Sequence, residues 1–312
     1  MGVIDDAVAE RESPPTGAPA LLRSPTAATL IAALVTVTLW ASAFVGIRSA
    51  GKTLSPGALA LGRLLVGSAA LLLITAARQE ALPQRSDVRK AAPALLLCGL
   101  LWFGAYNVLL NAGERRVDAG TAAMLVGVGP ILIAILAGLT LREGFPRTLL
   151  TGCAVAFGGV VLIGVATSNG GSSSTGVALC LVAAGAYAAA VVLQKSALGR
   201  LSALQVTLFC CLAATVACLP FAPQLIRQAD DASGSAIGWV LYLGVFPTAI
   251  AFTTWAFALA RTSAGRLGAT TYLAPPLSVF LGWLLLDEAP PALVLAGGGL
   301  CLAGVAVARR RS

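Results

Sequence analysis

Ten long apolar segments, separated by short breaks, constrain this chain more than any other feature of its sequence. About twenty residues cross a bilayer as a helix, so ten crossings use about 200 of the 312 residues and leave short loops. Charged residues make up 11% of the chain, against roughly a quarter in soluble domains. The sequence therefore predicts an all-α integral membrane protein with ten transmembrane helices, at about 27–47, 56–77, 91–111, 119–141, 148–167, 176–194, 203–221, 236–258, 267–286 and 291–308.

Basic residues fall mainly in alternate loops, which predicts the orientation of the chain. With a cytoplasmic N-terminus, fifteen Lys and Arg residues lie inside and five outside, and Arg63 lies within a span, which accounts for all 21. This distribution predicts a multi-pass protein of the cell membrane, inner or plasma, with both termini cytoplasmic. The predicted domains are a disordered cytoplasmic tail (1–25), a first five-helix repeat (26–167), an extracytoplasmic linker (168–175), a second five-helix repeat (176–308) and a basic cytoplasmic end (309–312).

The chain also repeats itself. An offset of 145 positions aligns AlaGly at 119–120 with AlaGly at 264–265, and it likewise aligns Pro130 with Pro275 and Glu143 with Glu288. A similar offset of 147 aligns Trp40 with Tyr187. Because each repeat contains five spans, an odd number, the second copy enters the membrane upside down, which predicts two inverted-topology repeats. Two inverted halves around one site have two nearly equivalent conformations, open to opposite sides, and this favours transport by alternating access.

Several classes of function are excluded by what the sequence lacks. It contains no histidine, so it cannot build a His-ligated metal site, a Ser-His-Asp triad or a histidine proton relay. The seven cysteines lie inside apolar runs without CxxC spacing, which is typical of packing residues. No nucleotide-binding loop is present. We therefore expect no metal, no cofactor, no enzymatic activity and no direct use of ATP. The net charge of +8 follows membrane topology and does not predict nucleic-acid binding.

The order of short motifs resembles the EamA-type members of the drug/metabolite transporter superfamily over residues 27–308. The motifs that carry the resemblance are LeuTrpAlaSerAlaPheValGlyIleArg at 39–48, SerPro at 55–56 followed by Arg63, AlaGly at 119–120, Pro130, ArgGlu at 142–143, AlaGly at 264–265, AlaProPro at 274–276 and AspGlu at 287–288. Each motif is loose, but their order across ten spans is specific. The resemblance implies export of small metabolites, amino acids or drug-like compounds.

Arg63 is the charge that lies deepest in a predicted span. It follows Pro56 by seven residues, about 10 Å along a helix axis. A guanidinium at this depth could bind a substrate carboxylate in bidentate fashion. The alternative is structural, with Arg63 snorkelling to the outer face or satisfying carbonyls of a broken helix.

Other polar and aromatic side chains within the spans are candidates for contact with substrate, because polar groups in lipid are costly. Asn amides offer donors and acceptors, and aromatic rings can line a wide cavity. The alternative for each is hydrogen bonding between helices, or an interfacial aromatic belt. The predicted substrate-binding residues are Trp40, Ser42, Arg63, Tyr106, Asn107, Asn111, Tyr187, Trp255 and Tyr272.

Prolines, glycines and two glutamates suggest roles in shape. Pro130 and Pro275 lie near the middle of the fourth and ninth predicted spans, where each would form a hinge or a static kink. The glycine-rich fifth and tenth spans favour tight packing or a homodimer face. Glu143 and Glu288 end spans, which favours helix capping or interfacial pairing with basic neighbours.

Together these features predict a secondary transporter that exports a small molecule from the bilayer-embedded bundle by alternating access. The alternatives are a multi-pass scaffold or receptor, or a channel-like facilitator without alternating access. No Asp, Glu or His lies in the interior of a predicted span, which weakens the case for proton coupling.

Overall fold

The computed structural model describes residues 26–117, 125–167, 173–277, 280–281 and 292–310, and within these ranges it contains helices and no strands. Eight of these helices are long and apolar enough to cross a membrane: Ala27–Ile47, Pro56–Ala77, Arg85–Gly113, Arg147–Ala166, Ser174–Ala197, Ala203–Asp230, Gly234–Leu259 and Ala292–Arg309. Gly129–Thr140 is a shorter apolar helix. The prediction of an all-α, multi-pass membrane protein is confirmed. The predicted tail at 1–25 and Glu288 lie outside the described residues.

Hydroxyl side chains start several of the helices. The side chains of Ser55, Ser202, Ser233 and Ser263 each accept a hydrogen bond from a backbone N–H in the first turn of α2 (Pro56–Ala77), α9 (Ala203–Cys218), α11 (Gly234–Leu243) and α13 (Ala264–Thr270), respectively. At Ser202 a capping box with Gln205 satisfies a second backbone donor. Because these caps satisfy the free donors of a helix end, they fix where the spans begin.

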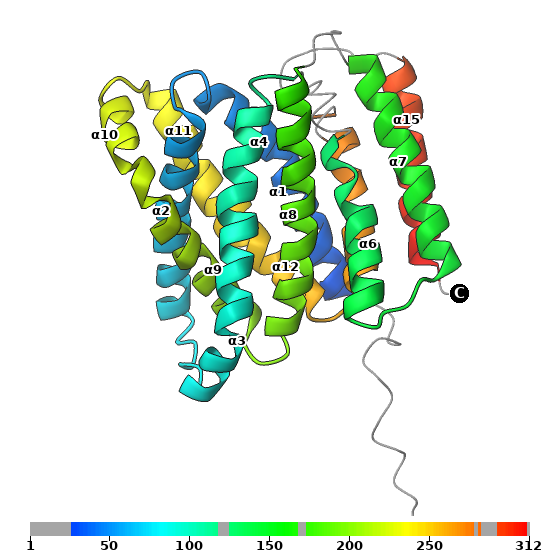
Figure 1. Ribbon diagram of the computed structural model, residues 1–312, viewed down its shortest axis with the longest axis horizontal. Helices are drawn as coiled ribbons and strands as arrows, with labels where there is room; N and C mark the ends of the chain where they lie inside the picture. The colour runs from blue at the N-terminus through cyan, green and yellow to red at the C-terminus, as the bar shows by residue number, and fades with distance from the viewer. Residues whose placement is uncertain (1–25, 118–124, 168–172, 278–279, 282–291, 311–312) are drawn as a thin grey trace, which may run out of the picture.

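The remaining helices complete a bundle with α8 (Ser174–Ala197) and α1 (Ala27–Ala50) in its middle (Figure 1). At one edge α7 (Arg147–Thr167) lies beside α15 (Ala292–Arg309), and at the opposite edge α10 (Ala222–Asp230) follows the short 3₁₀ segment η3 (Leu219–Phe221). The predicted seventh span, 203–221, therefore continues as helix to Asp230.

Four glycines bring α7 and α15 into close contact. A methyl group at Gly152 would meet the backbone of Ala308, and one at Gly304 would meet the backbone of Ala156. A methyl group at Gly159 would meet the carbonyl oxygen of Gly297, and one at Gly297 would meet the carbonyl oxygen of Gly159. Small residues allow such backbone approach between membrane helices. These four glycines of the predicted packing face therefore pack within the chain.

Two of the spans contain a π-helical segment. The span Arg85–Gly113 consists of α3 (Arg85–Cys98), η2 (Gly99–Tyr106) and α4 (Asn107–Gly113). The span Gly234–Leu259 consists of α11, η4 (Gly244–Ile250) and α12 (Ala251–Leu259). Both π segments begin at a glycine that lies against another helix. Gly99 lies against the carbonyl oxygen of Cys210 in α9, and Gly244 lies against the carbonyl oxygen of Arg63 in α2. Such segments leave main-chain carbonyls without their usual helical donors and recur at functional sites.

The proline-containing spans are interrupted helices. Pro130 lies in the first turn of α6 (Gly129–Thr140), directly after a turn at 127–128. Pro275 lies in a helical stretch at 274–277, directly after the 3₁₀ segment η5 (Thr271–Leu273). Each proline thus lies next to an interruption of its span, and the hinge or static kink expected at Pro130 and Pro275 stays a prediction. Because proline lacks an N–H and favours the first helical turn, each one begins a new helix at the break.

Candidate functional site

Arg63 lies inside the protein, between three helical elements. Its side chain is 5% exposed. Nε and Nη2 donate to the hydroxyl of Thr248 in η4 at 3.1 and 3.0 Å, and Nη1 donates to Oδ1 of Asn107 at the start of α4 at 2.9 Å. The snorkelling alternative is therefore wrong, because the guanidinium is turned inward. We call Arg63, Asn107 and Thr248 the polar cluster.

The π-helical segments orient the two partners of Arg63. The Thr248 hydroxyl donates to the carbonyl of Leu243, five residues earlier, at 2.8 Å. The Asn107 amide donates to the carbonyls of Phe103 and Trp102 at 2.8 and 3.1 Å. Both side chains thus direct their donors to main-chain carbonyls of the segments that carry them, and their oxygens are left as acceptors for the guanidinium.

The polar cluster carries a buried guanidinium that, within the described ranges, makes its hydrogen bonds to side chains other than carboxylates. Within the described part of the chain, every hydrogen-bond partner of Arg63 is a neutral oxygen. Removing an ionised group from water is costly unless an opposite charge compensates it. Arg63 also keeps donor capacity, because a guanidinium has five N–H groups. The arrangement is therefore suited to a small anion, above all a carboxylate.

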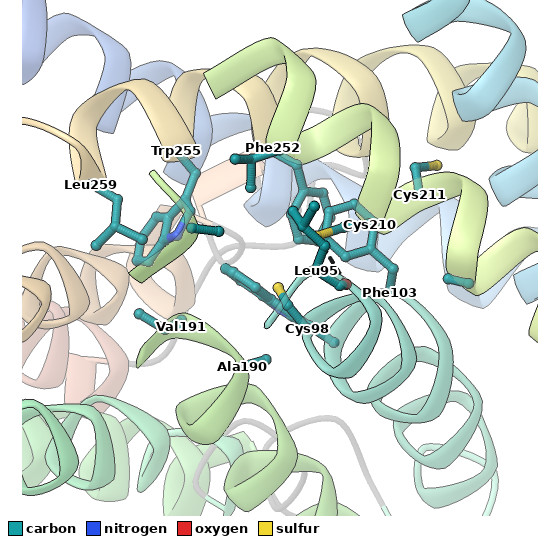
Figure 2. Packing of buried hydrophobic residues seen from close by; sticks show 14 of the residues in the cluster. Leu95, Cys98, Phe103, Ala190, Val191, Cys210, Cys211, Phe252, Trp255 and Leu259 are labelled. Atoms are coloured by element: carbon teal, nitrogen blue, oxygen red, sulfur yellow. Dashed lines mark hydrogen bonds between the residues drawn. The ribbon is translucent and has the colours of Figure 1, made fainter. Parts of the chain in front are cut away.

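An aromatic cluster adjoins the polar cluster. It contains Trp40, Trp102, Phe103, Tyr106, Tyr187, Phe252 and Trp255. Trp102 is central, with ring centroids at 5.7 Å from Trp40, 5.0 Å from Tyr187 and 5.6 Å from Trp255. In Figure 2, side chains from η2, α8, α9 and α12 meet in this region. Aromatic rings in such edge and tilted contacts form an apolar wall.

Hydrogen bonds to the main chain link the two clusters: besides the two bonds from Asn107 to Trp102 and Phe103, Trp40 makes a third. Trp40 Nε1 donates to the carbonyl oxygen of Pro247 at 3.2 Å, and Pro247 directly precedes Thr248. The polar and aromatic clusters are therefore contiguous parts of one interior, formed by α1, α2, η2, α8, η4 and α12. A molecule with a carboxylate and an apolar body matches this combination.

The structure brings together six of the nine residues predicted from the sequence. Trp40, Arg63, Tyr106, Asn107, Tyr187 and Trp255 belong to the two clusters. Ser42 instead bonds to Tyr242 (2.5 Å), which packs in a different apolar cluster. Asn111 donates to the carbonyl of Pro56 at 3.3 Å, and Tyr272 packs against α7 and α15.

Sequence reasoning missed Thr248, the third member of the polar cluster. Threonines are common in membrane helices, and Thr248 lies 185 residues from Arg63 in the chain. The neighbouring Pro247 was the available signal, because a proline inside a span disturbs the backbone around it.

Glu143 has a bridging role. Its two carboxylate oxygens accept hydrogen bonds from the backbone N–H groups of Ala264 and Gly265 at 2.8 and 3.2 Å. The carboxylate thus caps α13 across the bundle from the end of α6. The predicted capping role is present, but it serves another span.

Apolar spans that enclose a buried guanidinium and a cluster of aromatic rings are the frame of a multi-pass membrane protein. The model of the EamA-like transporter family matches this chain twice, at residues 27–165 and 174–310. The chain belongs to the EamA-like transporter family and is a secondary membrane transporter of small metabolites.

Two similar proteins support the family assignment, and one solved structure supports the fold. A probable terminal-alkyne amino-acid exporter of Streptantibioticus cattleyicolor is 36% identical over 90% of this chain and 93% of its own. The uncharacterized transporter YdfC of Bacillus subtilis is 34% identical over 91% of this chain and 92% of its own. A crystal structure that matches 91% of this chain and 99% of its own has a TM-score of 0.76 at 23% identity, so it has the same fold.

Proposed function

We propose that this transporter exports small metabolites that carry a carboxylate and an apolar body, and that Arg63 binds the carboxylate. The observation that carries this proposal is the buried guanidinium whose partners, over the described ranges, are the neutral oxygens of Asn107 and Thr248. An anionic substrate supplies the missing charge. The aromatic cluster receives the apolar part of the substrate. The names of two relatives, an amino-acid exporter and a probable amino-acid metabolite efflux pump of Salmonella typhimurium, agree with this substrate class.

The proposed architecture is ten transmembrane helices in two inverted five-helix repeats. Reciprocal contacts support it, because a two-fold relation requires that each contact occur twice. The contact of Gly152 with Ala308 has a counterpart, 145 positions away, in the contact of Gly297 with Ile163. The two family matches, one on each half, give independent support.

The same relation holds where α2 crosses α9. Ser68 and Thr215 are 147 positions apart and bond to one another at 2.9 Å. The contact of Gly244 with the Arg63 carbonyl corresponds in the same way to the contact of Gly99 with the Cys210 carbonyl. A pseudo-two-fold axis in the membrane plane would pass through this crossing.

The proposed orientation places both termini in the cytoplasm and the protein in the cell membrane. Its support is the distribution of fifteen inside against five outside basic residues. In this orientation Arg63 lies in the outer half of the bilayer. Substrate that enters from the cytoplasm then passes the aromatic cluster before its carboxylate reaches Arg63. The breaks before Pro130 and Pro275 are the proposed hinges.

Two measurements test this function. Metabolites released by cells that overexpress the protein should be enriched in carboxylates relative to cells that lack it. Enrichment confined to compounds without a carboxylate would contradict the proposal. In proteoliposomes loaded with unlabelled L-norleucine, external labelled L-norleucine should accumulate by counterflow. n-Pentylamine, which lacks the carboxylate, should compete poorly. Counterflow also separates alternating access from a channel, because trans-stimulation needs a carrier that returns loaded.

A further inference from the structure

Among the buried polar atoms that accept or donate no hydrogen bond in the described ranges, three belong to two side chains with no exposure, one within the aromatic cluster and one close to it. They are Gln194 in α8, through both Nε2 and Oε1 of its amide, and Trp255 in α12, through the indole Nε1. Both side chains have 0% exposure. A buried amide or N–H without a partner destabilises the fold, so its presence needs a reason.

The two groups come from facing helices. Lys195, next to Gln194, donates to the carbonyls of Leu259 and Thr262 and so fixes the end of α8 against the end of α12. Trp255 lies one turn before Leu259. Figure 2 shows Trp255 and Leu259 beside Val191, which lies one turn before Gln194 on α8. The Gln194 amide and the Trp255 indole therefore lie on opposing helices along one stretch of the interior.

Trp255 belongs to the aromatic cluster, whose other rings connect this stretch to the polar cluster. Gln194 follows Tyr187 by seven residues, so it lies on the same face of α8 about 10 Å further along the axis. Trp255 is 5.1 Å from Trp40, ring centroid to ring centroid, and Trp40 bonds to the backbone next to Thr248. Polar cluster, aromatic cluster and Gln194 thus follow one another through the bundle.

We infer that Gln194 and the Trp255 indole form a second substrate subsite, which binds a neutral hydrogen-bonding group, an amide or a hydroxyl, at the end of the substrate remote from its carboxylate. A glutamine amide offers two donors and one acceptor, and an indole N–H offers one donor. The neighbouring Lys195 ammonium donates to two main-chain carbonyls, so the subsite formed by Gln194 and Trp255 binds through neutral groups. This inference rests on the proposed carboxylate site at Arg63, because Arg63 fixes which end of the substrate reaches Gln194.

The test compares two probes that share the carboxylate, L-glutamine with a terminal amide and L-norleucine with a terminal methyl group. Binding is measured as ligand-induced thermal stabilisation of the purified full-length protein, and flux as proteoliposome counterflow. Wild-type protein should prefer L-glutamine. In Gln194→Leu this preference should fall about ten-fold, while L-norleucine is still transported, because a site that hydrogen-bonds a polar group discriminates against the analogue without it.

A stability readout separates this role from a structural one. Since Gln194→Leu replaces an amide without partners by an apolar side chain of similar size, the ligand-free variant should unfold at an unchanged or higher temperature. Gln84→Leu, at an exposed helix start without a side-chain hydrogen bond, is the matched control and should alter neither probe. An unchanged preference in Gln194→Leu, or loss of both probes with a lower unfolding temperature, would overturn the second subsite alone. A wild-type protein that binds neither probe would instead overturn the carboxylate site and this inference with it.

Discussion

The polar cluster has an apolar counterpart at the positions that the repeat offsets relate to it. The offsets of the repeat take Arg63 to Cys210 and Asn107 to Phe252, and they relate Thr248 to Phe103. In the polar cluster a guanidinium bonds to two side-chain oxygens. In the counterpart the rings of Phe103 and Phe252 are 4.0 Å apart by centroid, and Cys210 is fully buried with them in one core cluster (Figure 2).

The backbone around these two regions is alike, so the difference lies in the side chains. Gly99 and Gly244 lie against the carbonyls of Cys210 and Arg63 in corresponding ways. At these related positions one place carries a buried guanidinium with its two oxygen partners, and the other carries two phenylalanine rings and a cysteine. Under the proposed function, one such place is enough to bind the charge of the substrate.

The largest effect is expected when the apolar counterpart is made to resemble the polar cluster. Cys210→Arg would bury a cation beside Phe103 and Phe252, whose rings cannot accept hydrogen bonds as Asn107 and Thr248 do. We expect the free energy of unfolding to fall by about 3–5 kcal/mol and folded protein to be lost, because an uncompensated buried charge is among the most destabilising changes. Monodisperse yield and thermal unfolding in detergent measure it. Cys210→Ala should remain folded, and a wild-type yield of Cys210→Arg would show that the two regions are interchangeable.

Removal of the charge from the polar cluster should abolish most transport. Arg63→Met keeps a long apolar side chain but loses every donor, so we expect counterflow of L-norleucine to fall about 100-fold, the loss of a charge-assisted bidentate contact. Folded yield should remain, because Asn107 and Thr248 keep their own hydrogen bonds to main-chain carbonyls. Cys210→Ala serves again as the control and should transport normally. Unchanged flux in Arg63→Met would assign a structural role to the arginine.

Substitution of the corresponding glycines Gly244 and Gly99 separates an effect on helix packing from an effect on substrate binding. Gly244→Ala would push η4 away from α2 and carry Thr248 away from Arg63, and Gly99→Ala would push η2 away from α9 in the apolar counterpart. Both should lower the unfolding temperature to a similar extent, because overpacking typically costs about 1–3 kcal/mol. Only Gly244→Ala should also weaken L-norleucine binding, by about ten-fold. Equal loss of L-norleucine binding in both variants would mean that binding does not depend on the position of Thr248 relative to Arg63.

Much of the fold was accessible from the sequence because the signals are local. The apolar segments place most of the described spans to within a few residues, whereas the third begins earlier, at Arg85, and the seventh continues to Asp230. The low charge content isolates Arg63. The π segments were not predicted, because hydrophobic periodicity is uniform in spans that are apolar on all sides.

The site was predicted only where one residue is unusual by itself. Arg63 stands out in any apolar span, but its partner Thr248 is an ordinary residue until η4 is placed against α2 by Gly244. Gln194 escaped notice because it lies beside Lys195 at the end of a predicted span, where a polar residue is expected. Its unpartnered amide becomes visible only when burial and neighbours are known together.

The smallest predicted effect lies at the crossing between the two regions. Ser68 and Thr215 bond to one another at 2.9 Å, and Thr215 also donates to the carbonyl of Cys211 at 2.8 Å. Ser68→Ala and Thr215→Val should each destabilise the protein by about 0.6 kcal/mol, the typical size of a hydrogen bond between membrane helices. Because both variants remove the same bond, the double variant should be less destabilised than the sum of the two single variants. Additive losses of stability in thermal unfolding would show that packing alone holds α2 against α9. In that case the difference between the polar cluster and its counterpart would depend on Arg63, Asn107 and Thr248, and the Ser68–Thr215 bond would not contribute to it.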